Sequence, residues 1–259
     1  MNVIKIYGGL GNQMFQYALG LGMKKYGTKV IYENSWGSQP QNPPRPYALD
    51  KYGLNLEIGS FLNQPTLHEK EFLPNILKMD NTNFYGYWQY LSYYEKIWDQ
   101  LRDIFQVSEQ YYTEEYLKIK ERITKSNSLS IHVRRGDYVT VKGHIVLPFS
   151  YYMEAIGFTT EAEEIFIFSD DIPWCKEKFK VSYFEVPITF VDIEEYLAME
   201  LMRLCKHNII ANSTFSWWSA MLSSNTNQIV VAPKIWRVKP EEQLKMEDGS
   251  FLPFNWIRI

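Results

Sequence analysis

Residues 128–232 alternate short β-rich runs with helical patterns, and this alternation restricts the fold more than any other feature of the sequence. Strands that alternate with helices build right-handed βαβ units on a parallel sheet, which helices cover on both faces. Strands are expected at residues 129–133, 165–168, 182–186, 208–211 and 229–232. Helices are expected near 151–158, at 193–205 and from 215 onward. The second half is therefore predicted to be α/β.

The first half opens with a strand, a glycine turn and a helix. A β-rich run covers residues 3–7, and apolar side chains then recur at helical spacing up to the glycine at position 27. A second strand is expected at 28–33. Four prolines within residues 39–46 predict a surface loop.

A change in composition marks the expected domain boundary. Residues 83–98 carry eight aromatic side chains, and a helical pattern follows to about position 105. The segment 108–128 is charged, contains an expected helix near 114–123 and ends in polar residues. We therefore expect two lobes, one at 1–127 and the other at 128–259.

Composition excludes several classes of protein. With 46% hydrophobic and 16% aromatic side chains the chain can bury a core, and a net charge of −3 makes nucleic acid an unexpected partner. Cys175 and Cys205 lack metal-ligand spacing and are expected to be free thiols. Neither a signal-peptide pattern nor an apolar stretch of about 18 residues occurs. These features predict a soluble cytoplasmic protein with at most peripheral contact with the inner membrane face.

Four polar segments follow predicted strands, which is where open α/β sheets bind their ligands. The first is the turn Gly8-Gly9-Leu10-Gly11-Asn12-Gln13. Its glycines let the backbone approach a ligand, and the start of the following helix attracts an anion. The turn lacks the third glycine of a dinucleotide fingerprint and the Lys-Ser/Thr pair of a P-loop. A purely structural turn is the alternative.

The second segment carries two adjacent arginines at the end of the strand 129–133. Side chains alternate along a strand, so His132 and Arg134 share one face and Arg135 points away from Arg134. Guanidinium groups bind oxyanions in a two-pronged fork, which makes both arginines candidates for holding phosphate. The alternatives are a surface ion pair with Asp137 and, for His132, a structural role.

The third segment places Asp170 and Asp171 directly after the buried strand 165–168. Carboxylates there can accept hydrogen bonds from a guanine edge or from ribose hydroxyls, or can hold a metal ion. Capping of the next helix is the alternative.

The fourth segment opens a helix with four hydroxyl residues in seven, namely Ser213, Thr214, Ser216 and Ser219. Hydroxyls and free N–H groups at a helix start can surround a phosphate without a cation. Capping of the helix accounts for one of these residues and leaves the others unexplained.

Six motifs together resemble glycosyltransferase family 11, the inverting α1,2-fucosyltransferases. They are GGLGNQMFQYA at 8–18, RPYALD at 45–50, GYWQ at 86–89, HVRRGDY at 132–138, FSDD at 168–171 and NSTFSWW at 212–218. The resemblance implies a GT-B-like fold of two Rossmann-like lobes with parallel sheets and an intervening cleft. It implies that the lobe at 1–127 lies on the acceptor side and that the lobe at 128–259 binds GDP-fucose. It implies transfer of L-fucose from GDP-β-L-fucose to a galactose hydroxyl of a surface glycan or oligosaccharide. No metal or other cofactor is expected.

The resemblance also implies roles for single residues. Arg134 matches the arginine that meets the β-phosphate, and His132 with either Asp170 or Asp171 matches positions that recognise guanosine. The full donor-binding set is expected to be Gly9, Gly11, Asn12, Gln13, His132, Arg135, Asp170, Asp171, Ser213, Thr214 and Ser216. No acid occurs where related core-type enzymes carry a catalytic Glu, so Asp137 is the candidate base, or only an orienting partner for an arginine; His144 is a weaker candidate.

The aromatic run suggests where an acceptor sugar binds. Galactose presents an apolar C–H face that can stack on a ring, so Trp88, Gln89 and Tyr90 are candidate acceptor contacts. Aromatic side chains belong more often to the core, which is the alternative for these residues.

Two other functions fit parts of the sequence. A lectin-like protein would use the aromatic side chains without catalysis. A phosphotransferase would use Asp170 and Asp171 as metal ligands, but the sequence shows no His/Asp cluster to complete such a site. The transferase is favoured because Arg and Ser/Thr residues surround the predicted phosphate site.

Overall fold

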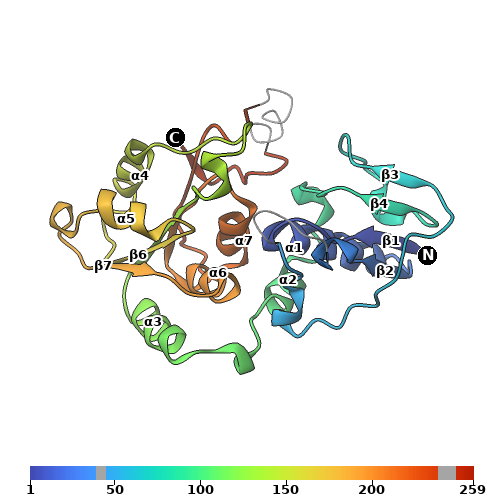
Figure 1. The fold of residues 1–259 in the computed structure, drawn as a ribbon, viewed down its shortest axis with the longest axis horizontal. Helices are drawn as coiled ribbons and strands as arrows, with labels where there is room; N and C mark the ends of the chain where they lie inside the picture. The colour runs from blue at the N-terminus through green and yellow to red at the C-terminus, as the bar shows by residue number, and fades with distance from the viewer. Residues whose placement is uncertain (39–44, 239–248) are drawn as a thin grey trace. The chain divides into compact units, whose positions relative to one another are not determined.

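A computed structural model describes residues 1–38, 45–238 and 249–259, which form two compact units, 1–108 and 109–259. Each unit is α/β and contains its own parallel sheet (Figure 1). The division falls earlier than the expected boundary after position 127, because helix α3 (Glu114–Lys125) packs against α6 (Glu195–Leu204) of the second unit. The expected surface loop at 39–46 lies mostly outside the described residues.

The first unit is built on a four-stranded parallel sheet with the order β2-β1-β4-β3. Its strands are β1 (Asn2–Lys5), β2 (Val30–Glu33), β3 (Thr66–His68) and β4 (Asn83–Tyr85). Its helices are α1 (Leu10–Lys25) and α2 (Trp98–Ile104). The expected strand–turn–helix–strand unit is confirmed. The three-residue strands β3 and β4 are too short to show a periodicity in the sequence.

The second unit is built on a six-stranded parallel sheet with the order β10-β9-β8-β5-β6-β7. Its strands are β5 (Ser128–Val133), β6 (Glu164–Ser169), β7 (Ile188–Val191), β8 (His207–Ile209), β9 (Val230–Ala232) and β10 (Ile257–Arg258). Besides α3 and α6 it contains α4 (Phe149–Ile156), α5 (Ile172–Lys178) and α7 (Thr214–Leu222). The alternating pattern predicted from the sequence is confirmed.

One expected strand is wrong. Residues 182–186 are not a strand: Val181–Tyr183 forms a 3-10 helix, and the strand that pairs with β6 is β7. The ladder begins where the Ile165 N–H donates to the Pro187 carbonyl at 2.9 Å. Both runs are rich in β-forming residues, and packing decides between them, because Val191 is buried whereas Val181 and Tyr183 are exposed.

Strand β5 is buried along its whole length and has two chemically different faces. Leu129, Ile131 and Val133 join an apolar cluster that includes Tyr152 and Phe179. The other face carries Ser128, Ser130 and His132, which are also buried. Buried polar groups need hydrogen-bond partners, so this second face determines where polar atoms of neighbouring elements must lie.

Replacing Ile131 by Ala is expected to lower the free energy of unfolding by about 2–5 kcal/mol, because the side chain is fully buried at the centre of the sheet. Urea denaturation followed by tryptophan fluorescence measures the change. Leu117→Ala on α3, where the side chain is 49% exposed, is the control and should change stability by less than about 0.5 kcal/mol. Equal effects of the two substitutions would contradict the central position of β5.

Candidate functional site

Three carboxylates surround the two arginines that follow β5. The Arg134 guanidinium is ion-paired with Asp137 and, at 2.7 Å through Nη1, with Asp170 Oδ2. Arg135 Nε lies 3.0 Å from Asp171 Oδ2, and the Arg135 backbone N–H donates to Asp170 Oδ1 at 2.8 Å. The last residues of β5 and β6, Val133 and Ser169, are paired in the sheet, so the loops that follow the two strands lie side by side. The sequence-predicted arginine and aspartate segments therefore form one cluster at the carboxyl ends of two neighbouring strands.

Glycine is required at position 136 for this cluster to form. A Cβ atom there would lie 2.4 Å from Asp170 Oδ2, much closer than any real contact. With glycine, the Asp170 carboxylate reaches both Arg134 and the Arg135 backbone. The expected Asp137–arginine ion pair is thus present, but it belongs to a larger network.

Aromatic rings fix the planes of both guanidinium groups. The Arg134 guanidinium lies 5.0 Å from the Tyr138 ring centre and that of Arg135 lies 4.3 Å from the Trp174 ring centre. The Tyr138 hydroxyl donates to the Asn212 carbonyl at 3.1 Å, which ties the arginine loop to the segment before α7. Tyr138 also stacks on His144, with ring centres 4.2 Å apart. These ring contacts and the ion pairs together restrict the two arginine side chains, so that their N–H donors point in defined directions.

Asp171 combines two of the roles considered from the sequence. Its Oδ1 accepts from the Trp174 N–H at 3.1 Å and so caps α5, while Oδ2 holds Arg135. Capping and arginine binding therefore coexist in one carboxylate.

His132 and Ser216 form a buried pair beneath the arginines. His132 Nδ1 lies 2.8 Å from Ser216 Oγ, which joins β5 to the first turn of α7. Burial, followed by the charge of Arg134, lowers the pKa of His132 to about 3, so the imidazole is neutral at physiological pH. Ser213 caps α7 by accepting from the Phe215 N–H. Ser216 is completely buried and faces His132, and Ser213 is also buried. Thr214 is the partly exposed one of the three hydroxyl residues in this turn.

The glycine turn of the first unit is held by a buried amide. Gly9 is the N-cap of α1, and its carbonyl accepts from the backbone N–H groups of Asn12 and Gln13. The Gln13 side chain donates to the Gly8 and Pro46 carbonyls at 2.9 and 2.8 Å and accepts from the Ala48 N–H at 3.0 Å. All of its polar atoms are engaged within the unit, so Gln13 positions the turn and the segment after residue 44.

A second buried amide, which the sequence reasoning missed, repeats this arrangement. Gln16 accepts from the Tyr7 N–H at 2.9 Å and donates to the Gly86 carbonyl at 3.1 Å. It therefore joins the ends of β1 and β4. The signal in the sequence was a glutamine within the apolar pattern of the predicted helix, where a polar side chain needs a buried hydrogen-bond partner.

The residues expected to contact an acceptor offer it almost no surface. Trp88 is fully buried, and Gln89 and Tyr90 are 7% and 5% exposed. Trp88 has a φ of 60°, a left-handed conformation in which its backbone N–H donates to Glu69 Oε2 at 2.9 Å. Gln89 donates to Asn12 Oδ1 at 3.0 Å. These three residues shape the carboxyl edge of the first sheet from within.

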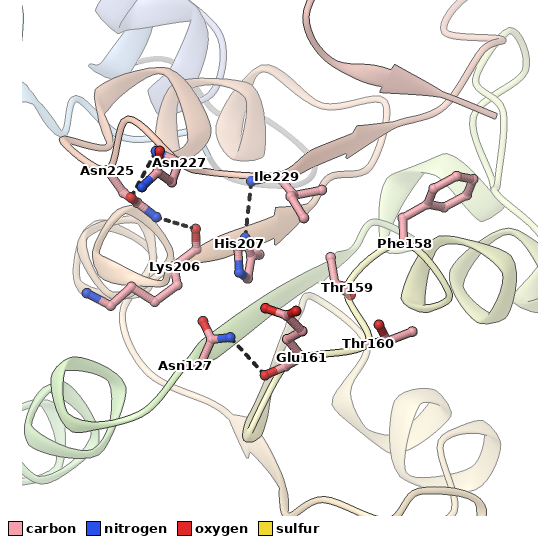
Figure 2. A pocket seen from close by; sticks show the side chains of 10 residues that line it. All are labelled: Asn127, Phe158, Thr159, Thr160, Glu161, Lys206, His207, Asn225, Asn227 and Ile229. Atoms are coloured by element: carbon pink, nitrogen blue, oxygen red, sulfur yellow. Dashed lines mark hydrogen bonds between the residues drawn. The ribbon is translucent and has the colours of Figure 1, made fainter.

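A pocket of about 480 Å³ lies at the opposite, amino edge of the second sheet (Figure 2). Asn127, Thr160, His207 and Asn227 line it: His207 is the first residue of β8, and the other three precede β5, β6 and β9. The His207 Nδ1 accepts from the Ile229 N–H at 3.1 Å. The pocket has an ordinary size for a ligand site. Parallel sheets bind substrates at their carboxyl ends, however, so we do not assign the nucleotide-sugar donor to this pocket.

Other expectations concern thiols, metals and membranes. Cys175 and Cys205 are buried free thiols, as predicted. Within the described part of the chain, no three His, Cys, Asp or Glu side chains are grouped so as to hold a metal ion. In the same residues no helix combines the length and the apolar character needed to cross a membrane.

Two α/β units, each built on its own parallel sheet, give the chain a GT-B-like fold. A solved structure of POFUT1 in complex with GDP shares this fold, with a TM-score of 0.50 and 10% identity over 89% of this chain and 97% of that one. The sequence matches the family described as glycosyl transferase family 11 over residues 65–259. The chain belongs to glycosyl transferase family 11.

Two bacterial relatives are similar over most of their length. An alpha-1,2-colitosyltransferase of Escherichia coli is 31% identical over 99% of this chain and 98% of its own. The O-antigen biosynthesis glycosyltransferase WbnK of Escherichia coli is 30% identical over 88% of this chain and 92% of its own. The family expected from the six motifs is thereby confirmed.

The neutral state of His132 predicts a pH dependence of stability. As pH falls below about 6.5 the unfolded chain protonates this histidine while the folded protein does not, so the free energy of unfolding falls. Between pH 7.5 and 5.5 this contribution amounts to about 1.4 kcal/mol. We expect the stability difference between wild type and His132→Gln to shrink by that amount in urea denaturation. A difference that stays constant over this interval would show that the folded imidazole also protonates.

Proposed function

We propose that this chain transfers L-fucose from GDP-β-L-fucose to the 2-hydroxyl of a galactose, with inversion and without a metal ion. The observation that carries the proposal is the pair of arginines fixed at the carboxyl ends of β5 and β6, beside the hydroxyl-bearing start of α7. The motif resemblance to α1,2-fucosyltransferases supports fucose as the donor sugar. The name of WbnK supports an acceptor within a growing surface glycan, and hence a cytoplasmic reaction at or near the inner membrane face.

Transfer of colitose is a second candidate. It is favoured by the similarity to the Escherichia coli colitosyltransferase over nearly the whole of both chains. The phosphate chemistry is the same for both sugars, so the arginine site does not discriminate between them.

Arg134 is proposed to stabilise the leaving group. When the bond between fucose C1 and the β-phosphate oxygen breaks, its electron pair stays on that oxygen and positive charge develops on the sugar ring. A guanidinium aimed at the β-phosphate stabilises this transition state more than the ground state. Arg135, the Thr214 hydroxyl and the first amides of α7 are proposed to hold the remaining phosphate oxygens.

Asp137 is proposed first as the positioning partner of Arg134. A donor phosphate that pairs with Arg134 is proposed to displace the Asp137 carboxylate from this guanidinium. The displaced carboxylate can take the proton that the galactose hydroxyl loses as its oxygen attacks C1 from the face opposite GDP. GDP and the fucosylated galactoside are the products.

Guanosine recognition is proposed to use His132 and the two aspartates. The Nδ1 atom of His132 is engaged by Ser216, so Nε2 is the atom left to face the nucleotide. Asp170 and Asp171 both hold arginines, and each carboxylate oxygen still has a second lone pair for a guanine or ribose donor.

Incubation of the protein with GDP-fucose, a panel of galactose-terminated oligosaccharides and EDTA tests the proposal. We expect a fucosylated product whose NMR spectrum shows an α1,2 linkage. A parallel reaction with a colitose donor distinguishes the second candidate. Binding of sugars without any transfer would favour the lectin-like function, and activity abolished by EDTA would contradict the metal-free reaction.

The Arg134→Ala variant is expected to lose at least about 10²-fold in kcat, because one preorganised donor to the leaving phosphate is removed. Arg122→Ala, which removes a more exposed arginine of α3 that pairs with Glu164, is the control for loss of an ion-paired arginine away from the site. Thermal unfolding of both variants checks that they fold. Near-normal turnover of Arg134→Ala would exclude the proposed role.

A further inference from the structure

Each strand of the first sheet delivers a ring to its carboxyl end. Tyr7 follows β1, Trp36 follows β2, His68 ends β3, and Tyr85 and Tyr87 end and follow β4. The carboxyl ends of parallel strands meet at one edge of a sheet, so the rings of four strands gather there. We call these five residues the ring cluster.

The rings contact one another around Tyr7. The Tyr7 ring stacks on Tyr85 at 5.0 Å and on Tyr87 at 4.8 Å, and it meets Trp36 edge-on at 5.8 Å. The His68 ring lies edge-on to Tyr85 at 5.2 Å. Tyr7 is 9% exposed, whereas the four rings around it are exposed or partly exposed. A buried ring therefore supports a set of rings that reach the surface.

The rings of the cluster differ in burial from those inside the unit. Interior aromatic side chains such as Phe84, Trp88 and Tyr94 are fully buried, whereas Trp36, Tyr85 and Tyr87 are only partly buried. Hydrogen bonds fix the backbone of the cluster. The Tyr87 N–H donates to Glu69 Oε2 at 2.7 Å, and the Tyr7 N–H is held by Gln16.

Polar side chains adjoin the same rings. Tyr7, Trp36, Asn34, Arg45 and Tyr47 lie together beside the glycine turn, where they enclose no space large enough for a water molecule. A ligand would therefore lie on the surface of this group of side chains. An amide and a guanidinium beside partly exposed rings match the two surfaces of a pyranose: an apolar C–H face that stacks on a ring, and hydroxyls that accept from N–H donors.

We propose that the ring cluster, with Asn34 and Arg45, binds the galactosyl end of the acceptor. The proposal rests on the proposed function for its choice of sugar. It replaces Trp88, Gln89 and Tyr90 as acceptor contacts by side chains that have surface to offer. Trp36 and Tyr87 supply the stacking faces, and Tyr7 positions them.

Saturation-transfer NMR of lactose with the wild-type protein and GDP tests the site without requiring turnover. We expect transfer to the ring protons of the galactose. In Trp36→Leu and Tyr87→Leu the dissociation constant should rise about tenfold, because a flat stacking face is lost while apolar volume is kept. Tyr26→Leu is the matched control, since it removes a 40% exposed tyrosine at the C-terminal end of α1, and it should bind lactose like the wild type.

Transfer assays separate this proposal from the proposed function. If lactose is an acceptor, the two ring variants should raise KM for lactose and leave KM for GDP-fucose unchanged. Unchanged lactose binding in both variants, or no lactose binding by the wild type, would overturn the ring site even if fucose is transferred. Loss of lactose binding in the variants of a chain that transfers no fucose would support the ring site and overturn the proposed function.

Discussion

The ion pair between Arg134 and Asp170 joins the ends of β5 and β6, and the rest of the arginine site depends on it. Asp170 also accepts from the Arg135 backbone, so this one carboxylate sets the direction in which both arginines leave the strand. The Arg134 and Asp170 side chains are 17% and 27% exposed. Removing either partner of such a pair leaves a poorly solvated charge, which costs more than the pair itself contributes to stability. Substitution of a single member of this network is therefore expected to be more destabilising than the ion pair is stabilising.

Buried polar side chains hold the ligand-binding edges of both sheets. In the second unit His132 and Ser216 connect β5 to α7, and in the first unit Gln13 and Gln16 connect the glycine turn to segments far along the chain. A buried polar group must find a partner, so it fixes the backbone to which it bonds more strictly than apolar packing does. Gln13 and Ser216, which are candidate ligand contacts in the sequence, thus hold the backbone of the loops in position.

How far the sequence predicted the structure depended on whether local pattern or tertiary packing decided the outcome. The β5–β6 core was predictable because its apolar runs are long and continuous, and the site loops followed from the rule that ligands bind at strand ends. The edge strand was misplaced because residues 182–186 and β7 have similar propensities, and only pairing with β6 separates them. The aromatic run could not be resolved either. Trp88 is buried while its neighbour Tyr87 is partly exposed, and no periodicity in the sequence reveals the left-handed backbone conformation at Trp88.

The charge of the arginine site also depends on tertiary structure that the sequence does not reveal. The net charge of −3 concealed an arginine pair, but the structure shows that this pair is already balanced by Asp137, Asp170 and Asp171. The proposed diphosphate would therefore compete with these carboxylates for the same guanidinium groups. In the proposed mechanism this exchange couples the two substrates: a phosphate that pairs with Arg134 displaces the Asp137 carboxylate, which is then proposed to accept the proton of the acceptor hydroxyl.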